Sequence, residues 1–357
     1  VGGNWEKGVT QTPEDGYYTT SAGKIRADFI TMKENGIDLV VISFHEYTTF
    51  LLPAVFGAAE EVGLLVAPLV ELHEIYSRPE FQPLDENNNP KGTAFGYALR
   101  EDTKREFTRF ISVALSFWEN SPAAYMPKGK LGFFLYDSHF SGICSSLEFQ
   151  EHLVRNVEEV IANNDPSGGP PWIVPDLTDP PTSHQTLMAP DSNYWKMAFA
   201  SRYVEFWEEI REELENNFGG LHIISGESWG HYRGSSNDFQ YGLFKAIVGL
   251  DAFDSSYIYS PSFIFTMKYD DGDESQPFGV YMERYFALNS IQSQYQGGYD
   301  QLKITSVAPS YNDTALREEG FVIPAWTDHG NTFDIQMGHA LSLNSDIILI
   351  STWNEFY

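Results

Sequence analysis

The chain has 357 residues, of which 42% are hydrophobic and 20% are charged, a composition typical of globular rather than disordered proteins. This length fits either two domains or a single barrel of eight strands and eight helices. A formal charge of −28 argues against nucleic acid and anionic membrane surfaces as partners, and the single cysteine, Cys144, excludes an intrachain disulfide and a cysteine-based zinc cluster.

Short apolar runs alternate with longer amphipathic segments along most of the chain. The segment 25–36 is the first predicted helix, because Ile25, Phe29 and Met32 recur on one helical face and Gly36 follows as a terminator. Further helices are predicted at 51–63, 101–119, 146–164, about 194–217, around 238–249 and 332–344. Strands are predicted at 38–44, 64–71, 130–136, 221–226, 254–259, 304–308 and 346–351.

The predicted strands are nearly continuous apolar runs, which indicates burial on both faces and therefore a parallel sheet covered by helices. We predict an α/β fold, a (β/α)8 TIM-like barrel in one domain over 1–357, with a loop insertion at about 165–193. The chain supplies seven strands where such a barrel needs eight. We therefore expect either an open sheet or a first strand upstream of Val1, which would make the sequence a fragment of a longer protein.

Membrane spans, metals and cofactors are not predicted. No run of eighteen or more apolar residues is present, so this segment has no membrane span. The acidic stretches 84–90 and 269–275 do not match the twelve-residue calcium loop, and His45 and His73 do not form a recognised zinc pattern.

Polar and aromatic residues follow nearly every predicted strand. Because a parallel barrel carries its site at the carboxyl ends of its strands, we expect these residues to meet at one edge. Glu46 and Glu71 lie at two of these ends. The candidate site residues are, in chain order, His45, Glu74, Tyr76, Tyr136, Asp137, Glu227, Tyr257, Tyr311, Arg317, Trp353, Asn354 and Glu355.

This mixture of carboxylates and aromatic rings predicts a glycan or oligosaccharide substrate. Aromatic faces bury the apolar side of a pyranose ring while their polar tips still form hydrogen bonds. Carboxylates bind hydroxyl groups and supply acid–base chemistry, and glycosidases usually use two of them.

Each candidate also has a structural interpretation. Asp137 is suited to cap a following helix, His45 to satisfy a local hydrogen bond, and Glu227 to pair with Arg233. Tyr257 alternates with Tyr259 along a strand, so one of the two would face the helices. Glu355 is the hardest to explain structurally, because a carboxylate directly after an apolar strand is costly without a partner or a task.

Several stretches resemble one known family. The sequence DIILISTWNEFY at 346–357 resembles the strand and active-site motif of glycoside hydrolase family 99, the endo-α-mannosidases, and of related family-99-like proteins. The stretches ELHEIYSR (71–78), GFFLYDSHF (132–140), FDSSYIY (253–259) and SVAPSYNDTALR (306–317) are similar to further segments of that family and follow the same order. The chain differs from the family pattern at Ile75, His139, Ala308 and Ser310.

The resemblance implies a (β/α)8 barrel that cleaves inside α-mannoside-type glycans with retention of configuration. Glu355 matches the base, which acts through the sugar's own 2-hydroxyl group by way of a 1,2-anhydro sugar. The general acid of the family lies three residues later, at a position 358 that this sequence does not contain. Since general acid catalysis is worth ~10²–10⁴-fold in rate, we expect the chain as given to be feeble or inactive. The substrate site implied by the resemblance consists of Asn354, Tyr311, Arg317, Glu74, Tyr76, Tyr136 and Asp137.

Two alternatives remain open at this point. One is a family-99-like protein associated with glycosyl transfer in surface polysaccharide synthesis. The other is a surface protein without catalysis that keeps the fold for glycan binding or as a scaffold. For each of the three interpretations, the acidic composition fits a secreted or cell-surface location.

Overall fold

Parallel strands form the centre of the protein, whose computed structural model describes residues 21–72, 75, 101–136, 193–227, 253–258, 302–307 and 331–351. Five strands form one sheet in the order β1-β2-β3-β4-β5, and two form a second sheet, β6-β7. All neighbouring strands in both sheets are parallel. The strands are β1 (Leu39–Phe44), β2 (Leu65–Glu71), β3 (Leu131–Tyr136), β4 (Leu221–Glu227), β5 (Ser255–Ile258), β6 (Ile304–Val307) and β7 (Ile347–Ile350).

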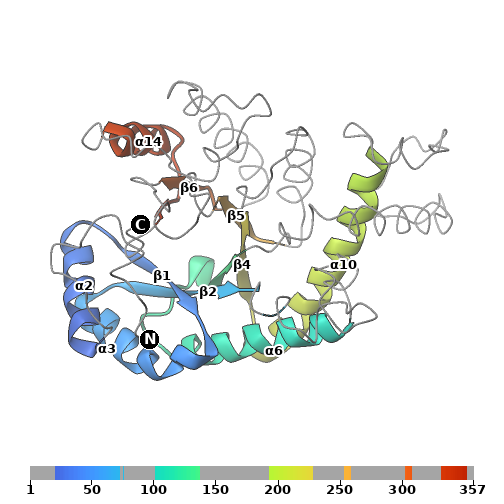
Figure 1. The fold of residues 1–357 in the computed structure, drawn as a ribbon, viewed down its shortest axis with the longest axis horizontal. Coiled ribbons are helices and arrows are strands. Elements are labelled where there is room, and N and C mark those ends of the chain that lie inside the picture. The colour runs from blue at the N-terminus through green and yellow to red at the C-terminus, as the bar shows by residue number, and fades with distance from the viewer. Residues whose placement is uncertain are drawn as a thin grey trace, which may run out of the picture.

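Helices alternate with these strands along the chain. Figure 1 shows the strands following an arc from β1 to β6, with α2, α3, α6 and α10 outside the arc and α14 beyond β6. The helices are α2 (Ala22–Glu34), α3 (Leu52–Val62), α6 (Glu101–Trp118), α10 (Asn193–Phe218) and α14 (Asn331–Ser342), with the short 3-10 helices η1 (Glu46–Leu51) and η3 (Pro127–Gly129).

Local sequence signals account for the helix ends. The Ser21 side chain accepts a hydrogen bond from the backbone N–H of Lys24 and so caps the start of α2. Helix α3 has Pro53 in its first turn and ends at Gly63, which adopts φ 76°. This left-handed conformation favours glycine because the residue has no Cβ, and Gly63 donates its N–H to the carbonyl of Ala59.

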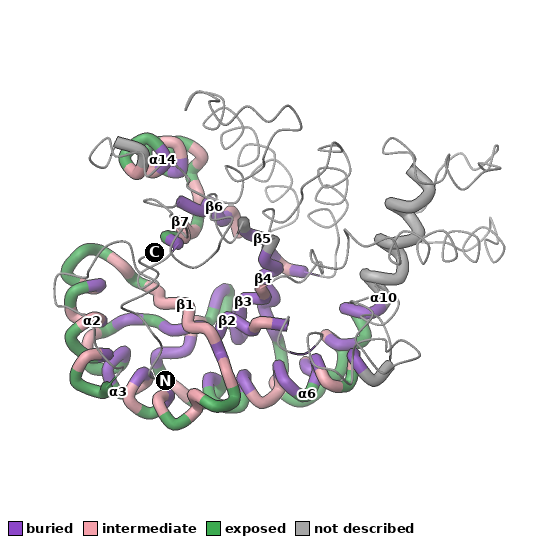
Figure 2. The backbone as a smooth tube through the Cα atoms, viewed as in Figure 1, coloured by how far each residue is buried: buried purple, intermediate pink, exposed green. Residues whose placement is uncertain are grey.

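The two faces of the sheet contribute to two different apolar clusters. Side chains that point toward the helices, such as Val66 and Val70 of β2, belong to the larger cluster, in which Trp118 of α6 and Trp207 of α10 are fully buried. Burial is concentrated on the central strands and on the faces of the helices that meet them (Figure 2). Because both faces are covered, the strands consist of apolar residues at successive positions, as the sequence predicts.

The opposite face of the sheet carries a second cluster, which we call the inner cluster. Ala67 and Leu69 of β2 belong to it, and along β1 to β4 its members alternate with residues of the larger cluster. Both edge strands, β1 and β7, pack against the same cluster, which a flat sheet of this width would not allow. The inner cluster consists of Ala67, Leu69, Phe134, Ile224, Tyr257 and Ile304, with Leu39, Val41, Tyr125, Tyr136, Leu302, Ile347 and Leu349 packed against it.

A group of hydrogen bonds joins the two sheets where β4, β5 and β6 begin. His222 Nε2 lies 3.0 Å from Ser255 Oγ, which also accepts from the backbone N–H of Leu302 at 3.0 Å and donates to the carbonyl of Asp254 at 2.7 Å. The Asp254 carboxylate accepts from Arg211 of α10 and from the backbone N–H of Ile223, each at 2.8 Å. We call His222, Asp254, Ser255 and Leu302 the amino-edge seam.

A similar carboxylate stands before β7. Asp346 accepts from the backbone N–H of Lys303 at 2.8 Å and donates its own N–H to the carbonyl of Lys303 at 2.8 Å. Burial, together with the charge of Asp346, raises the pKa of Tyr125 to about 12. Tyr125 precedes β3, the middle strand of the five-stranded sheet, so the charge of a residue at the start of β7 influences a residue at the start of β3.

The observed elements confirm the predicted α/β class and the seven predicted strands. Each strand end differs from the predicted one by no more than one residue. The predicted helices at 146–164 and around 238–249 and the loop insertion at about 165–193 lie outside the described residues. Among the described residues, no helix is both long enough and apolar enough to cross a membrane.

Candidate functional site

Polar side chains stand where the first three described strands end. His45 follows β1 directly, Glu71 is the last residue of β2, and Tyr136 is the last residue of β3. Since the strands are parallel and adjacent in the sheet, these ends lie at the same edge. We call His45, Glu71 and Tyr136 the carboxyl rim.

The alternation of side chains sets the direction of Glu71. Ala67 and Leu69 of the same strand belong to the inner cluster, and Glu71 follows at the same period of two residues. Its side chain is 17% exposed, so the carboxylate is partly shielded from water. The rim therefore places a carboxylate directly beyond the apolar interior.

His45 lies next to this carboxylate. Its Nε2 is 3.9 Å from Glu71 Oε1, and its side chain is 22% exposed. The His45 ring stacks on Tyr47, with the ring centroids 5.1 Å apart and an angle of 22° between the planes. Stacking fixes the orientation of the imidazole, which keeps its polar edge toward Glu71.

Tyr136 completes the rim on the other side of Glu71. The two residues are partners in the register of β2 and β3. Tyr136 packs against the inner cluster and is half-buried. An aromatic side chain thus lies beside a carboxylate and an imidazole, a combination that offers both apolar and polar contacts to a ligand.

Tyr257 occupies the packed interior in place of the expected sugar contact. Its side chain is 1% exposed, and its hydroxyl donates to the carbonyl of Leu135 at 3.1 Å. Gly226 lies against it so closely that a Cβ at this position would be 2.7 Å from the tyrosine hydroxyl and 2.1 Å from the Leu135 carbonyl oxygen. The ring is therefore a packing element that bridges β3 and β5.

The remaining predicted site residues lie largely outside the described part of the chain. Glu227 is the last residue of β4 and pairs in register with Ile258, but its side chain is outside the description. The residues outside the described ranges are Glu74, Tyr76, Asp137, Tyr311, Arg317, Trp353, Asn354 and Glu355.

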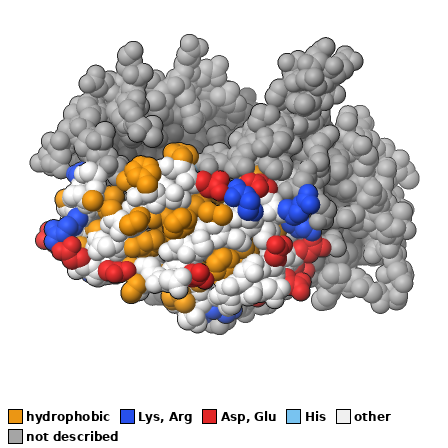
Figure 3. Space-filling model, turned by 90° about the horizontal axis from the view of Figure 1, so that it is seen from below, with side chains coloured by type: hydrophobic (Ala, Val, Ile, Leu, Met, Phe, Trp, Pro, Cys, Tyr) orange, Lys and Arg blue, Asp and Glu red, His pale blue; other side chains and the backbone are white. Residues whose placement is uncertain are grey.

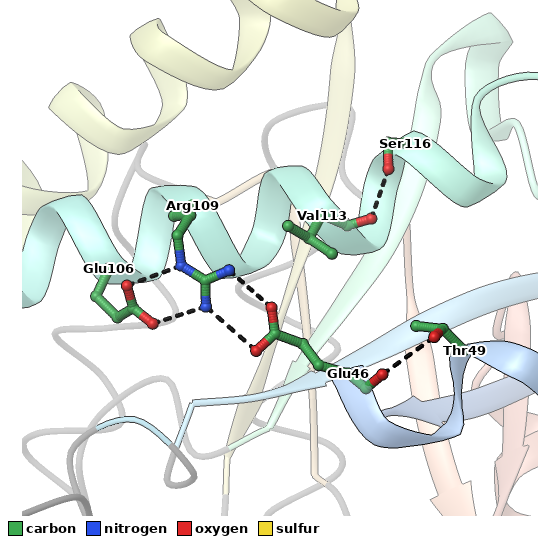
Figure 4. Close-up of polar contacts among 6 residues, drawn as sticks. All are labelled: Glu46, Thr49, Glu106, Arg109, Val113 and Ser116. Atoms are coloured by element: carbon green, nitrogen blue, oxygen red, sulfur yellow. Dashed lines mark hydrogen bonds and ion pairs between the residues drawn. The ribbon is translucent and has the colours of Figure 1, made fainter.

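Glu46, the neighbour of His45 in sequence, points to a different part of the molecule. Its carboxylate accepts hydrogen bonds of 2.7 and 3.3 Å from Arg109 of α6, which also donates two bonds to Glu106 (Figure 4). The hydrogen bonds that Arg109 donates to Glu106 and then to Glu46 raise the pKa of Arg109 above its usual range. Glu46 therefore attaches η1 to α6 and has a structural role.

Glu71 belongs to the carboxyl rim but was not among the candidate site residues predicted from the sequence. Glu71 stands at a strand end in the sequence, but the family resemblance directs attention to Glu74, three residues later. The period of two along β2 was the signal that would have selected Glu71, because it places this residue on the face opposite Val66 and Val70. Within the described ranges, no three His, Cys, Asp or Glu side chains are grouped so that they could hold a metal ion.

Comparisons with known proteins support the fold. The sequence matches no family model and no curated protein. Among solved structures, a glycoside hydrolase-like protein aligns over 99% of this chain and 82% of its own, with 11% identity and a TM-score of 0.56. A β-galactosidase from the psychrophilic Marinomonas ef1 aligns over 94% of this chain and 52% of its own, with 12% identity and a TM-score of 0.56.

A structure of the family-99 endo-α-mannosidase from Bacteroides thetaiotaomicron also aligns. It covers 98% of this chain and 76% of its own, with 17% identity and a TM-score of 0.49. At these identities the likeness concerns the fold alone. The chain thus has a glycoside hydrolase-like α/β fold, built on parallel strands.

Proposed function

We propose that the protein is a glycoside hydrolase that acts on a glycan at the carboxyl ends of its strands. The observation that carries the proposal is the carboxyl rim, where an imidazole, a carboxylate and an aromatic ring stand together above an apolar interior. In folds of this class, catalytic and binding groups come from this edge of the sheet. The glycoside hydrolase-like fold of the structures aligned above supports the same assignment.

The finer architecture that we propose is a (β/α)8-type barrel. Support comes from the inner cluster, which receives side chains from all seven described strands, including the two edge strands β1 and β7. Further support comes from the influence of the charge of Asp346, before β7, on Tyr125, before β3, since these strands belong to different sheets. A closed barrel brings all the strand ends to one mouth, so residues from distant parts of the sequence can contact one substrate.

For the reaction, we propose endo-acting, retaining cleavage of α-mannoside-type glycans, with Glu355 as the base. In this proposal the base assists attack by the sugar's 2-hydroxyl group. Asn354, Trp353, Tyr311, Arg317, Asp137, Glu74, Tyr76 and Glu227 join the carboxyl rim in binding the glycan. The support is the similarity of 346–357 to the family-99 motif and the position of this stretch after β7. The proposed location is outside the cell or at its surface.

The test is product analysis with α-linked mannan oligosaccharides. The natural protein should release shorter oligosaccharides without a nucleotide-sugar donor, and Glu355→Gln should abolish turnover while leaving glycan binding intact. Unchanged turnover in Glu355→Gln would rule out the proposed base. Products that appear only with a nucleotide-sugar donor would favour a transferase, and binding without any product would favour a glycan-binding protein.

A further inference from the structure

The spacing of His45 and Glu71 fits a bound group between them. The distance of 3.9 Å from His45 Nε2 to Glu71 Oε1 is longer than a hydrogen bond, which ends near ~3.5 Å. A single oxygen atom placed ~2.8 Å from each of the two atoms fits this separation. The pair is therefore spaced to share a third polar atom.

The chemistry of the pair restricts what this third atom can be. An ionised carboxylate only accepts hydrogen bonds, so the bridging group must donate one to Glu71. An imidazole with its proton on Nε2 donates, so the same group must also accept one from His45. A hydroxyl group does both, whereas an oxygen of an ionised carboxylate, sulfate or phosphate has no hydrogen to donate.

The surroundings of the pair match a substrate contact. Both side chains are partly shielded, with 22% of His45 and 17% of Glu71 exposed. A ligand can therefore reach them, and few water molecules compete for the hydrogen bonds that it forms there. Hydrogen bonds to a charged acceptor in such a place are stronger than neutral ones. Tyr136 lies beside Glu71 in the register of β2 and β3 and supplies an aromatic neighbour for the same sugar.

We infer that His45 and Glu71 together hold one hydroxyl group of the glycan, and that Glu71 is a residue that determines specificity for a neutral sugar at this position. The inference rests on the proposed function, because it takes the ligand to be a glycan. The inference adds a defined hydrogen-bond arrangement to the proposed function. It assigns this arrangement to Glu71, whereas the family resemblance selects Glu74, three residues later.

The test uses an α-linked mannobioside and its monodeoxyfluoro derivatives, in each of which fluorine replaces one hydroxyl group. Binding to the full chain is measured by titration calorimetry or by NMR. Fluorine cannot donate to a carboxylate, so one derivative should bind about 10- to 100-fold more weakly than the parent compound. In Glu71→Ala the parent should lose a similar factor, and the difference between the parent and that derivative should disappear.

Two further variants keep the test conclusive. Glu71→Met has a side chain of similar length without an oxygen acceptor, so it should also lose the discrimination, and it replaces Glu71→Ala if that variant is poorly folded. Glu46→Gln is the matched control, because Glu46 is adjacent to His45 in sequence but binds Arg109 on the helix side, and it should keep the wild-type pattern.

The possible results separate the inference from the proposed function. If the wild-type protein binds the parent and all derivatives equally, or if Glu71→Ala keeps the discrimination, the inference is overturned while the proposed function stands. If the wild-type protein binds no α-linked mannoside, the proposed function itself fails, and the inference fails with it.

Discussion

The two edges of the parallel sheet are held in different ways. At the amino-edge seam, His222, Ser255 and Leu302 are joined by hydrogen bonds of 3.0 Å, and Asp254 bonds both Arg211 and Ile223 at 2.8 Å. At the carboxyl rim, the contact between His45 and Glu71 measures 3.9 Å. The seam uses its polar groups to join strands through hydrogen bonds, while the contact between His45 and Glu71 at the rim is longer than a hydrogen bond.

This difference is what a division between stability and function predicts. In barrel-type folds the carboxyl ends of the strands carry chemistry and the amino ends contribute stability. Changes at the seam should therefore alter the free energy of unfolding, and changes at the rim should alter glycan binding.

Asp254→Ala should lower the free energy of unfolding by about 3–4 kcal/mol. The substitution removes two hydrogen bonds to a carboxylate and leaves the partly buried Arg211 and the backbone N–H of Ile223 without this acceptor. Urea unfolding measures the change. A loss below about 1 kcal/mol would show that the seam does not hold β4 and β5 together.

Acidification should destabilise the protein through His222. Burial lowers the pKa of His222 to about 4, whereas the unfolded residue titrates near ~6.5. Between these values the unfolded state binds more protons, so stability falls as pH drops from about 6.5 to 4, by about 3 kcal/mol for this residue alone. The check is the difference in pH dependence between wild type and His222→Gln, which should be smaller in the variant. Parallel curves would contradict the assignment.

Asp346→Ala should have a smaller effect than Asp254→Ala. Asp346 is exposed, and its described contact is the hydrogen bond from the backbone N–H of Lys303. We expect a loss of about 1 kcal/mol. A second observable is the pKa of Tyr125, which should fall because the charge of Asp346 contributes to raising it. Ultraviolet titration of tyrosine measures this pKa, and an unchanged value would contradict the influence of Asp346 on Tyr125.

Glu71→Gln should change the free energy of unfolding least, by less than about 1 kcal/mol, because the amide keeps the shape and the accepting oxygen of the side chain and the contact with His45 is long. Glycan binding should nevertheless weaken about tenfold or more. This combination would place Glu71 among the functional residues. A large loss of stability with unchanged binding would move it to the structural ones.

The outer surface of the protein differs from both edges of the sheet in the kinds of side chain that it exposes. Figure 3 shows hydrophobic side chains gathered on the face seen from below, over the helices that lie lowest in Figure 1, with acidic and basic side chains beside them. Large exposed hydrophobic residues include Phe50 of η1 and Phe117 of α6. Arg26 of α2 pairs with Glu61 of α3, and Arg109 of α6 pairs with Glu46 of η1. These paired charges partly compensate one another on the outer surface.

Much of the fold could be predicted from the sequence, because the signals are local. The continuous apolar runs of β2 and β3 reflect burial on both faces, and Gly63 marks the end of α3. The amino-edge seam was not predicted. It depends on His222, Asp254 and Leu302, which are distant in sequence and meet only when the strands pack side by side.

The candidate site was predicted in part. The rule that strand ends meet predicted that His45 and Tyr136 stand at the same edge of the sheet, but strand position alone did not show which neighbours face inward. Tyr257 stands near a strand end as well, yet its ring fills the interior because Gly226 leaves space for it. Glu46 and Glu71 have the same chemistry in the sequence, and only the packing of α6 against η1 separates their roles.

The most direct test of the division between the two edges is hydrogen exchange of the full chain with and without an α-linked mannan oligosaccharide. A glycan site at the carboxyl rim predicts slower exchange on ligand addition in peptides that contain residues 44–46, 71–72 and 136, and unchanged exchange at 221–223, 254–255 and 302–303. Protection confined to the second group of peptides would contradict a glycan site at the carboxyl rim.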